Sequence, residues 1–191
     1  LCDLARLRPY HTLYDPMCGS GTILIEGAMM VHNIAPGVNR YFSAERWDVI
    51  DEKIWADERN RARDLVNYDT DFIAYGSDID EDAIEIAKIN AKRAGVERKI
   101  KFEKADIRNF EPKSEKGTVI CNPPYGERLL DIEEAQKLYK IMGEKFIRKH
   151  GWSYYFISPS EEFEKEFGRK ADKRRKLYNG MIKCQLFMYF K

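Results

Sequence analysis

The stretch from Leu13 to Thr22 constrains the fold of this chain more than any other. An apolar and aromatic run ends in the acid Asp15, passes through a turn with Gly19 and Gly21, and continues into a helical pattern. This order of strand, glycine turn and helix is typical of the first unit of a nucleotide-binding α/β fold. The two glycines allow a sharp turn and let a ligand approach the main chain, where a Cβ would collide.

The charge and spacing of this turn favour one class of cofactor. The third glycine of the dinucleotide pattern G-x-G-x-x-G is missing, because Leu24 stands in its place. Asp15 puts a carboxylate where a pyrophosphate would approach. A carboxylate repels phosphate but suits a cationic ligand such as a sulfonium or an ammonium. The residues therefore favour S-adenosylmethionine over NAD.

Length and composition limit the remaining possibilities. The 191 residues suit one domain with a substantial core. No 18-residue apolar run or signal-peptide pattern occurs, so the expected location is the cytoplasm, without a membrane contact. Four cysteines without a C-x-x-C pair and three histidines support neither a metal site nor a disulfide framework, and we expect buried, reduced thiols. The net charge of +1 is too small for tight binding of a polyanion by this domain alone.

Strand and helix patterns alternate along the chain. Strands are expected over about 11–15, 72–78, 99–103, 116–121 and 153–158, and helices over about 1–8, 21–32, 51–66, 83–94, 133–149 and 161–167. Asp80 should cap the helix over 83–94, and Gly95 should end it. Asn179-Gly180, between strand patterns over 173–178 and 181–190, predicts a closing hairpin. The sequence therefore predicts a doubly wound α/β sheet with a terminal antiparallel hairpin.

A segment of about 33–67 interrupts the alternation between the first two expected strands. It begins with the turn residues 33–40, which show no periodicity, and continues into the charged helix expected over 51–66. The buried stripe of this helix is expected to consist of Trp47, Ile50, Ile54 and Leu65. Long insertions at the carboxyl end of a strand often cover a ligand, so the segment is either a cover or a flap without contact to the site.

Three acids follow the first three expected strands: Asp15, Asp78 and Asp106. Ligands of doubly wound sheets lie at the carboxyl ends of the strands, where the strand order reverses. There Asp78 is expected to accept hydrogen bonds from ribose hydroxyls, Ile79 to lie against an adenine ring, and Asp106 to accept from the adenine amino group. Each acid alone has another explanation as a cap or a loop residue. Three acids in register behind a glycine turn favour a nucleoside site.

The sharpest feature follows the fourth expected strand, in Asn122-Pro123-Pro124-Tyr125. Two successive prolines fix φ and remove two donors, so the loop is stiff and presents bare carbonyls. The Asn122 side-chain oxygen and the Pro123 carbonyl can both accept from one NH₂ group, while Tyr125 stacks on a planar base. The pattern predicts a site for a planar nitrogen whose N–H bonds are drawn aside. A rigid turn without chemistry is the alternative.

Three segments, residues 15–22, 33–40 and 122–129, resemble the methyltransferase domain of the bacterial 23S rRNA guanine-N2 methyltransferases. Residues 176–184 are similar to the closing hairpin of that family, so the similarity covers essentially the whole chain. The N-P-P-Y motif alone is shared with DNA adenine-N6 and protein glutamine-N5 methyltransferases. The second segment and the Gly126-Glu127-Arg128-Leu129 end of the third narrow the choice to this family.

The resemblance implies a Rossmann-like class I S-adenosylmethionine-dependent methyltransferase, with a mostly parallel seven-stranded sheet and a C-terminal antiparallel hairpin. Members of the family carry an N-terminal THUMP RNA-binding domain. Residues 1–191 are therefore expected to be one domain of a longer protein, with an insertion at about 33–67. The implied reaction is methyl transfer from S-adenosylmethionine to the N2 amino group of a guanine in RNA. The expected RNA is 23S rRNA, with tRNA as the alternative.

Two sets of residues carry this hypothesis. The candidate cofactor-binding residues are Asp15, Cys18, Gly19, Ser20, Gly21, Thr22, Asp78, Ile79, Asp106 and Asn122. The candidate catalytic residues are Asn122, Pro123, Pro124 and Tyr125. Rival hypotheses are an N6-adenine methyltransferase, a protein glutamine N5-methyltransferase and a non-enzymatic nucleotide-binding domain.

A basic run near the C-terminus has two interpretations. It consists of Arg169, Lys170, Lys173, Arg174, Arg175 and Lys176. Such a run is either a contact surface for RNA or a solvated charged face. The topology predicts that it lies before the sixth strand, at the amino end of the sheet and away from the chemistry.

Overall fold

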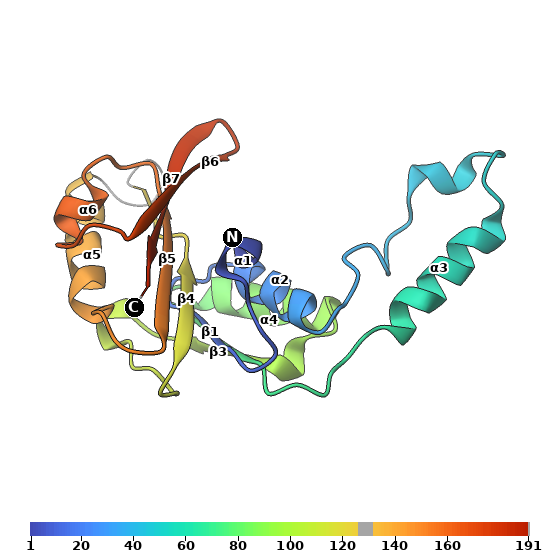
Figure 1. The fold of residues 1–191 in the computed structure, drawn as a ribbon, viewed down its shortest axis with the longest axis horizontal. Helices are drawn as coiled ribbons and strands as arrows, with labels where there is room; N and C mark the ends of the chain where they lie inside the picture. Colours follow the sequence, from blue (N-terminus) through green and yellow to red (C-terminus); the bar gives the residue numbers. More distant parts are fainter. Residues whose placement is uncertain (126–131, 191) are drawn as a thin grey trace.

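Seven strands form one sheet in the order β3-β2-β1-β4-β5-β7-β6, in a computed structural model that describes residues 1–125 and 132–190 (Figure 1). The strands are β1 (Thr12–Asp15), β2 (Ile73–Asp78), β3 (Ile100–Lys104), β4 (Gly117–Cys121), β5 (Trp152–Ser158), β6 (Lys173–Asn179) and β7 (Ile182–Tyr189). The first five strands pair in parallel, and β7 pairs antiparallel with both β5 and β6. The predicted fold class is confirmed.

Helices cover both faces of this sheet. The α-helices are α1 (Cys2–Ala5), α2 (Thr22–Val31), α3 (Glu52–Asp64), α4 (Glu81–Arg93), α5 (Ile132–Lys145) and α6 (Phe163–Glu166). Short 3-10 turns are η1 (Ser43–Arg46), η2 (Glu97–Lys99) and η3 (Ile107–Asn109). No helix within the described part of the chain is long and apolar enough to cross a membrane. Helices α1, α2 and α4 contribute to one buried cluster, and α5 and α6 contribute to the other.

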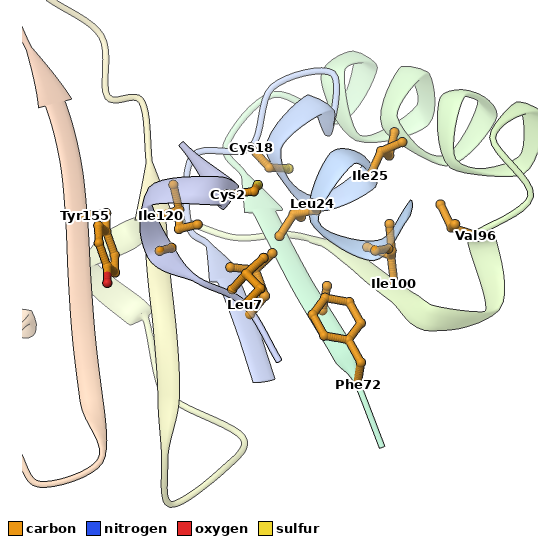
Figure 2. Close-up of a cluster of buried hydrophobic side chains, with 14 of the residues drawn as sticks. Cys2, Leu7, Cys18, Leu24, Ile25, Phe72, Val96, Ile100, Ile120 and Tyr155 are labelled. Atoms are coloured by element: carbon orange, nitrogen blue, oxygen red, sulfur yellow. The ribbon is translucent and has the colours of Figure 1, made fainter. Parts of the chain in front are cut away.

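The strand order reverses between β1 and β4, which pair in parallel through Leu13 and Thr118. From β1 the chain builds outward to β2 and β3, whereas β4 and β5 lie on its other side. Side chains of a strand alternate between the two faces. Leu13 therefore belongs to the cluster under α2, and Tyr14 belongs to the cluster under α5. Figure 2 shows the first cluster, in which Leu24 and Ile120 lie between helix and sheet. The reversal is where such folds bind ligands.

Several predicted boundaries need shortening. Helix α5 ends at Lys145 instead of Lys149, and the first and last expected helices are each four residues long. The caps of α4 agree with expectation, because the Asp80 carboxylate accepts from the Asp82 amide and Gly95 has φ +74°. Residues 126–129, part of the family resemblance, lie outside the described residues.

Residues 33–67, which we term the arm, project from the body of the molecule (Figure 1). The arm follows α2, and a helix that connects parallel strands runs back toward their amino ends. It therefore leaves at the amino end of the sheet, opposite the edge where β1 and β4 end. The interpretation of this segment as a cover for the ligand site is not supported by this placement.

The expected buried stripe of the arm helix is wrong. None of the residues of α3 is buried, and Trp47, Ile54 and Leu65 are each more than half exposed. Ile50 is half-buried. Helical spacing buries a stripe only where a second layer lies against it, and Figure 1 shows α3 standing apart from the sheet and from the helices that cover it. The arm is instead held by its own contacts, such as the pair of Arg59 with Glu45 at 2.5 Å.

The closing hairpin differs from expectation by one residue. The β6–β7 pairing continues to Asn179 opposite Ile182, which leaves Gly180 and Met181 as the loop. Gly180 has φ +60°, and a two-residue hairpin loop takes a glycine readily at its first central position.

The basic run also lies elsewhere than predicted. Its last four residues belong to β6, the exposed edge strand of the sheet. Lys176 is paired with Gln185, which in turn faces Ser158, the last residue of β5. The run therefore begins near the amino end of the sheet but reaches its carboxyl edge. Cations on an edge strand also discourage pairing with another chain.

A candidate methyltransferase active site

The glycine turn connects β1 to α2 through backbone conformations that favour glycine. Gly19 has φ +50°, and Gly21, the N-cap of α2, has φ +81°. A Cβ on Gly21 would lie 3.1 Å from Ala87, whereas a Cβ on Gly19 would meet nothing within 4 Å. The turn is therefore packed on one side and open at Gly19, as the approach of a ligand to the main chain requires.

Two side chains from neighbouring elements fix this turn. The Gly19 amide donates to the Asp78 carboxylate at 2.9 Å, and the Asp80 amide donates to its other oxygen at 3.1 Å. From α4, the Asn90 side-chain amide donates to the Ser20 carbonyl at 3.1 Å. Asp78, expected to bind ribose, thus also holds the turn in place. The role of Asn90 was missed, and the only signal in the sequence was an amide on the inner stripe of a predicted helix.

Asp15 ends β1 and is almost fully buried, at 1% exposure. Burial raises the pKa of this carboxyl to about 7, because desolvation disfavours its charged form. Hydrogen bonds from the Met17 amide and the Cys121 thiol act in the opposite direction. A carboxyl with this pKa sits near the point of ionisation at neutral pH, so a nearby cation would favour its charged form.

Asp106 and Ile79 lie at the expected places, just after the ends of β3 and β2. Ile79 is 67% exposed, so its face is free to pack against a ring. Asp106 caps η3 and accepts from the Arg108 guanidinium at 2.5 Å, which lowers the pKa of the Asp106 carboxyl. Arg108 was not predicted as a partner, although a cation two residues after an acid is a visible signal.

The N-P-P-Y loop begins directly after β4, beside the end of β1. Asn122 is exposed and Pro123 is buried, so the exposed asparagine side chain is attached to a backbone that the buried proline holds in place. The Tyr125 hydroxyl donates to the Asn122 side-chain oxygen. A carbonyl oxygen has two lone pairs, so Asn122 keeps the capacity to accept from a second donor.

The closing hairpin reaches this loop. The Asn179 side-chain amide donates to the Tyr125 hydroxyl at 3.4 Å. Tyr125 packs against the same buried cluster as Leu177 and Ile182 of the hairpin. Sequence reasoning missed this contact, because nothing in the sequence relates residues 54 positions apart.

The cysteines of the site have a structural role. All four cysteines are free and buried, and Cys18 and Cys121 lie close to Asp15. Burial raises the pKa of both thiols, so they stay protonated and poorly nucleophilic. Ser20 and Thr22 are exposed at the turn, with their hydroxyls 3.2 Å apart. Within residues 1–125 and 132–190, no three His, Cys, Asp or Glu side chains gather as metal ligands.

The structure thus brings together the predicted site residues at one edge of the sheet. The turn, Asp78 and Ile79 form one side, and Asn122 to Tyr125 form the other. The open face at Gly19 and the acceptors at Asp15 and Asp78 suit a cationic nucleoside better than a phosphate. The carboxylates beside the glycine turn and the acceptors of the N-P-P-Y loop can together hold a cationic nucleoside and a planar amine side by side.

Comparisons with known proteins agree with this chemistry. Over its full length the chain is 41% identical to YpsC of Bacillus subtilis (strain 168), provisionally named an RNA methyltransferase. It is 40% identical, over 93% of its length, to the Ribosomal RNA large subunit methyltransferase K/L of Shewanella sp. (strain W3-18-1). The chain spans about half of YpsC (49%) and 26% of the Shewanella protein.

Two solved structures show a similar level of sequence identity to this chain. SMU.472, provisionally named a methyltransferase and complexed with SAH, has a TM-score of 0.91 at 42% identity, over 98% of this chain and 50% of that one. A predicted N6-adenine-specific DNA methylase from Listeria monocytogenes str. 4b F2365 has a TM-score of 0.90 at 45% identity, over 99% and 50%.

The family model described as RMKL-like, methyltransferase domain, matches residues 1–187. That match covers the glycine turn, the strand-end acids and the N-P-P-Y loop in their observed arrangement. The chain therefore belongs to the UPF0020 family of RMKL-like methyltransferase domains.

Proposed function

We propose that this domain transfers a methyl group to the exocyclic N2 amino group of a guanine in RNA, with 23S rRNA as the expected substrate. The observation that carries the proposal is the N-P-P-Y loop at the end of β4, directly beside the glycine turn that follows β1. The loop sets an acceptor for a planar amine next to a site that suits a cationic nucleoside.

S-adenosylmethionine supplies the methyl group on a positively charged sulfur. Gly19, Asp78 and Ile79 would hold its nucleoside part, and Asp15 would favour its charge. Asp106 would accept a hydrogen bond from the adenine amino group once the Arg108 guanidinium releases one of the Asp106 carboxylate oxygens. Cys18, Ser20, Gly21 and Thr22 complete the turn around it.

Asn122 and Pro123 would orient the target nitrogen. Its lone pair is delocalised into the ring, so two acceptors must draw both N–H bonds aside to aim the lone pair at the methyl group. Acceptors preorganised at a site of growing positive charge stabilise the transition state without reorganisation. Tyr125 would stack on a flipped-out base and offset part of the few kcal/mol that flipping costs.

The substrate class rests on the relatives. YpsC and the K/L protein both carry RNA methyltransferase names, and the second acts on large-subunit RNA by its name. Because the chain spans half or less of either protein, we propose that residues 1–191 form one catalytic domain, with the arm as an insertion. An RNA-binding domain elsewhere in the whole protein would supply further affinity.

N6 of adenine is the second candidate target. The Listeria structure carries an N6-adenine name, and adenine N6 is also a planar exocyclic amine. The test is nucleoside analysis and primer-extension mapping of 23S rRNA from cells that lack the whole protein. Loss of one N2-methylguanosine, restored by the wild-type gene but not by Asn122→Ala, supports the proposal. Loss of N6-methyladenosine supports the second candidate. A 23S rRNA whose methylation is unchanged in these cells contradicts both.

A further inference from the structure

The β6–β7 hairpin extends past the carboxyl edge of the sheet. Gln185 pairs with Ser158, the last residue of β5, so residues 177–183 continue beyond that strand. We term residues 177–183 the hairpin tip, and Figure 1 shows the hairpin rising past the end of β5. The tip therefore stands at the same edge as the candidate active site.

One face of the tip contacts the N-P-P-Y loop. Leu177, Asn179 and Ile182 share this face, because Leu177 and Asn179 are two residues apart and Asn179 pairs with Ile182. Asn179 donates to the Tyr125 hydroxyl, and the two apolar side chains join the buried cluster on which Tyr125 packs. This face positions the acceptor loop.

The opposite face is exposed and carries cations around an aromatic ring. Tyr178 and Lys183 are cross-strand partners, and Lys176 lies two residues before Tyr178. The Lys176 ammonium lies 5.2 Å from the Tyr178 ring centroid, and 62% of Tyr178 is exposed. At the end of the tip Met181 is 98% exposed. Aromatic faces with adjacent cations bind single-stranded nucleic acid through stacking and phosphate contacts.

The charge of the hairpin is one-sided. Residues 173–190 contain five Lys or Arg and no Asp or Glu, although the whole chain has a net charge of only +1. Arg174 is paired with Glu164, whereas Lys176 and Lys183 are exposed beside the active-site edge. The positive charge gathered at this edge attracts a polyanionic partner there, although the chain as a whole is nearly neutral.

From this arrangement we propose that the hairpin tip binds the RNA strand next to the target nucleotide. Tyr178 stacks on a flanking base, and Lys176 and Lys183 contact its phosphates. Met181 inserts where the target base leaves the stack, as apolar wedges do in bent or opened nucleic acids. The inference rests on the proposed function, since it assumes an RNA substrate.

The test compares two tip variants of the whole protein, Tyr178→Ala/Met181→Ala and Lys176→Ala/Lys183→Ala, with a matched control. Tyr10→Ala/Ile147→Ala removes an exposed aromatic and an exposed aliphatic side chain, 72% and 60% exposed, away from the active-site edge. The probe is 23S rRNA from cells that lack the protein, and the readouts are RNA affinity against salt and single-turnover methylation. SAH affinity, measured by calorimetry, reports an intact cofactor site in each variant.

The first tip variant should lose about five- to a hundredfold in RNA affinity, as expected for a lost stacking residue. The second should flatten the slope of log affinity against log salt by about 1.4, or roughly 0.7 per lost phosphate contact. SAH affinity should not change. Tip variants that bind RNA like the control, with the same slope, would overturn the inference. If the tip variants lose RNA affinity but the wild type adds no methyl group to RNA, the proposed function falls and the tip remains an RNA-binding surface.

Discussion

Asp15 combines burial with a position beside the proposed sulfonium site. Its side chain is shielded from water, and its pKa lies near 7. A buried carboxyl of this kind responds to pH in the range where enzymes work. Two expectations follow from the same residue, one for stability and one for binding.

In the absence of cofactor, ionisation of Asp15 should lower stability. Its pKa rises from 3.8 to about 7 on folding, so its contribution is fully present below pH 3.8 and is lost as the pH rises through 7. Urea unfolding should therefore show the wild type losing stability relative to Asp15→Asn between pH 5 and pH 8. Asp82→Asn, at an exposed position, is the control for the exchange of a carboxylate for an amide. A constant difference between wild type and Asp15→Asn would contradict the raised pKa.

Cofactor binding should depend on pH with a definite sign. S-adenosylmethionine carries a sulfonium charge that its demethylated product lacks, so only the former gains when Asp15 ionises. The ratio of product Kd to S-adenosylmethionine Kd should therefore rise from pH 6 to pH 8 in calorimetry. Asp15→Asn should flatten this rise. A ratio that is independent of pH in the wild type would show that the Asp15 carboxylate does not interact with the sulfonium charge.

Asn122 should separate binding from chemistry. Asn122→Ala is expected to keep SAH affinity nearly intact and to slow single-turnover methylation about a hundred- to a thousandfold. That loss, about 2.7–4 kcal/mol, is typical of one missing preorganised polar partner. Asn60→Ala, on the exposed face of the arm helix, is the matched control and should retain the full rate. A fully active Asn122→Ala enzyme would mean that the N-P-P-Y loop is only a turn.

At the scale of elements, the arm contributes little to the core. The base of the arm is attached by His32, the residue after α2, whose ring contacts the Asn67 carbonyl at 2.9 Å. Within the arm, the Asn33 side-chain amide donates to the Leu65 carbonyl. Further out, α3 buries none of its residues. Stability drawn from apolar burial is therefore concentrated in the two clusters on either side of the sheet.

Shortening the arm should leave the domain folded. The Arg59 guanidinium donates to the Arg40 carbonyl at 2.7 Å, so a short Gly-Ser linker can replace residues 41–58. We expect the melting temperature and SAH affinity to change little, because the removed residues belong to neither buried cluster. Calorimetric melting of both proteins measures the effect. Replacing residues 41–58 by the same linker with Arg59→Ala controls for the loss of the Arg59 contact. A large fall in melting temperature would show that the arm supports the core.

At the scale of the whole molecule, charge limits what this domain can do alone. A net charge of +1 gives little nonspecific attraction to RNA, and the cations of the hairpin are a local exception. The chain also spans 49% of the length of YpsC. Under the proposed function, a further domain of the whole protein would be the expected source of most RNA affinity.

The isolated chain should methylate rRNA more slowly than the whole protein. At matched salt and subsaturating RNA, we expect a lower rate for residues 1–191, because fewer phosphates are contacted. SAH affinity should be equal in the two proteins and serves as the control. The measurement is methyl incorporation into rRNA from cells lacking the protein. Equal rates would show that this domain holds RNA by itself, and the hairpin tip would then be its main contact surface.

The sequence by itself determined the order of the elements and the candidate site residues that follow the strands. Local chemistry is sufficient for this, because strand patterns, the Gly19–Gly21 turn and the Asp80 cap depend on neighbours along the chain. The acids after the strands could be placed at one edge because parallel strands end together. The N-P-P-Y loop could be recognised because four consecutive residues supply both its stiffness and its acceptors.

Tertiary structure alone decided which helical stripe is buried and which distant residues meet. The arm helix has the spacing of a buried stripe, but it stands apart from the sheet (Figure 1), so none of its residues is buried. The basic run reaches the active-site edge because strand register carries it there. Asn179 contacts Tyr125, and Asn90 holds the glycine turn, through pairings far apart in the chain. Burial and long-range contact depend on what packs opposite a residue, which local sequence does not contain.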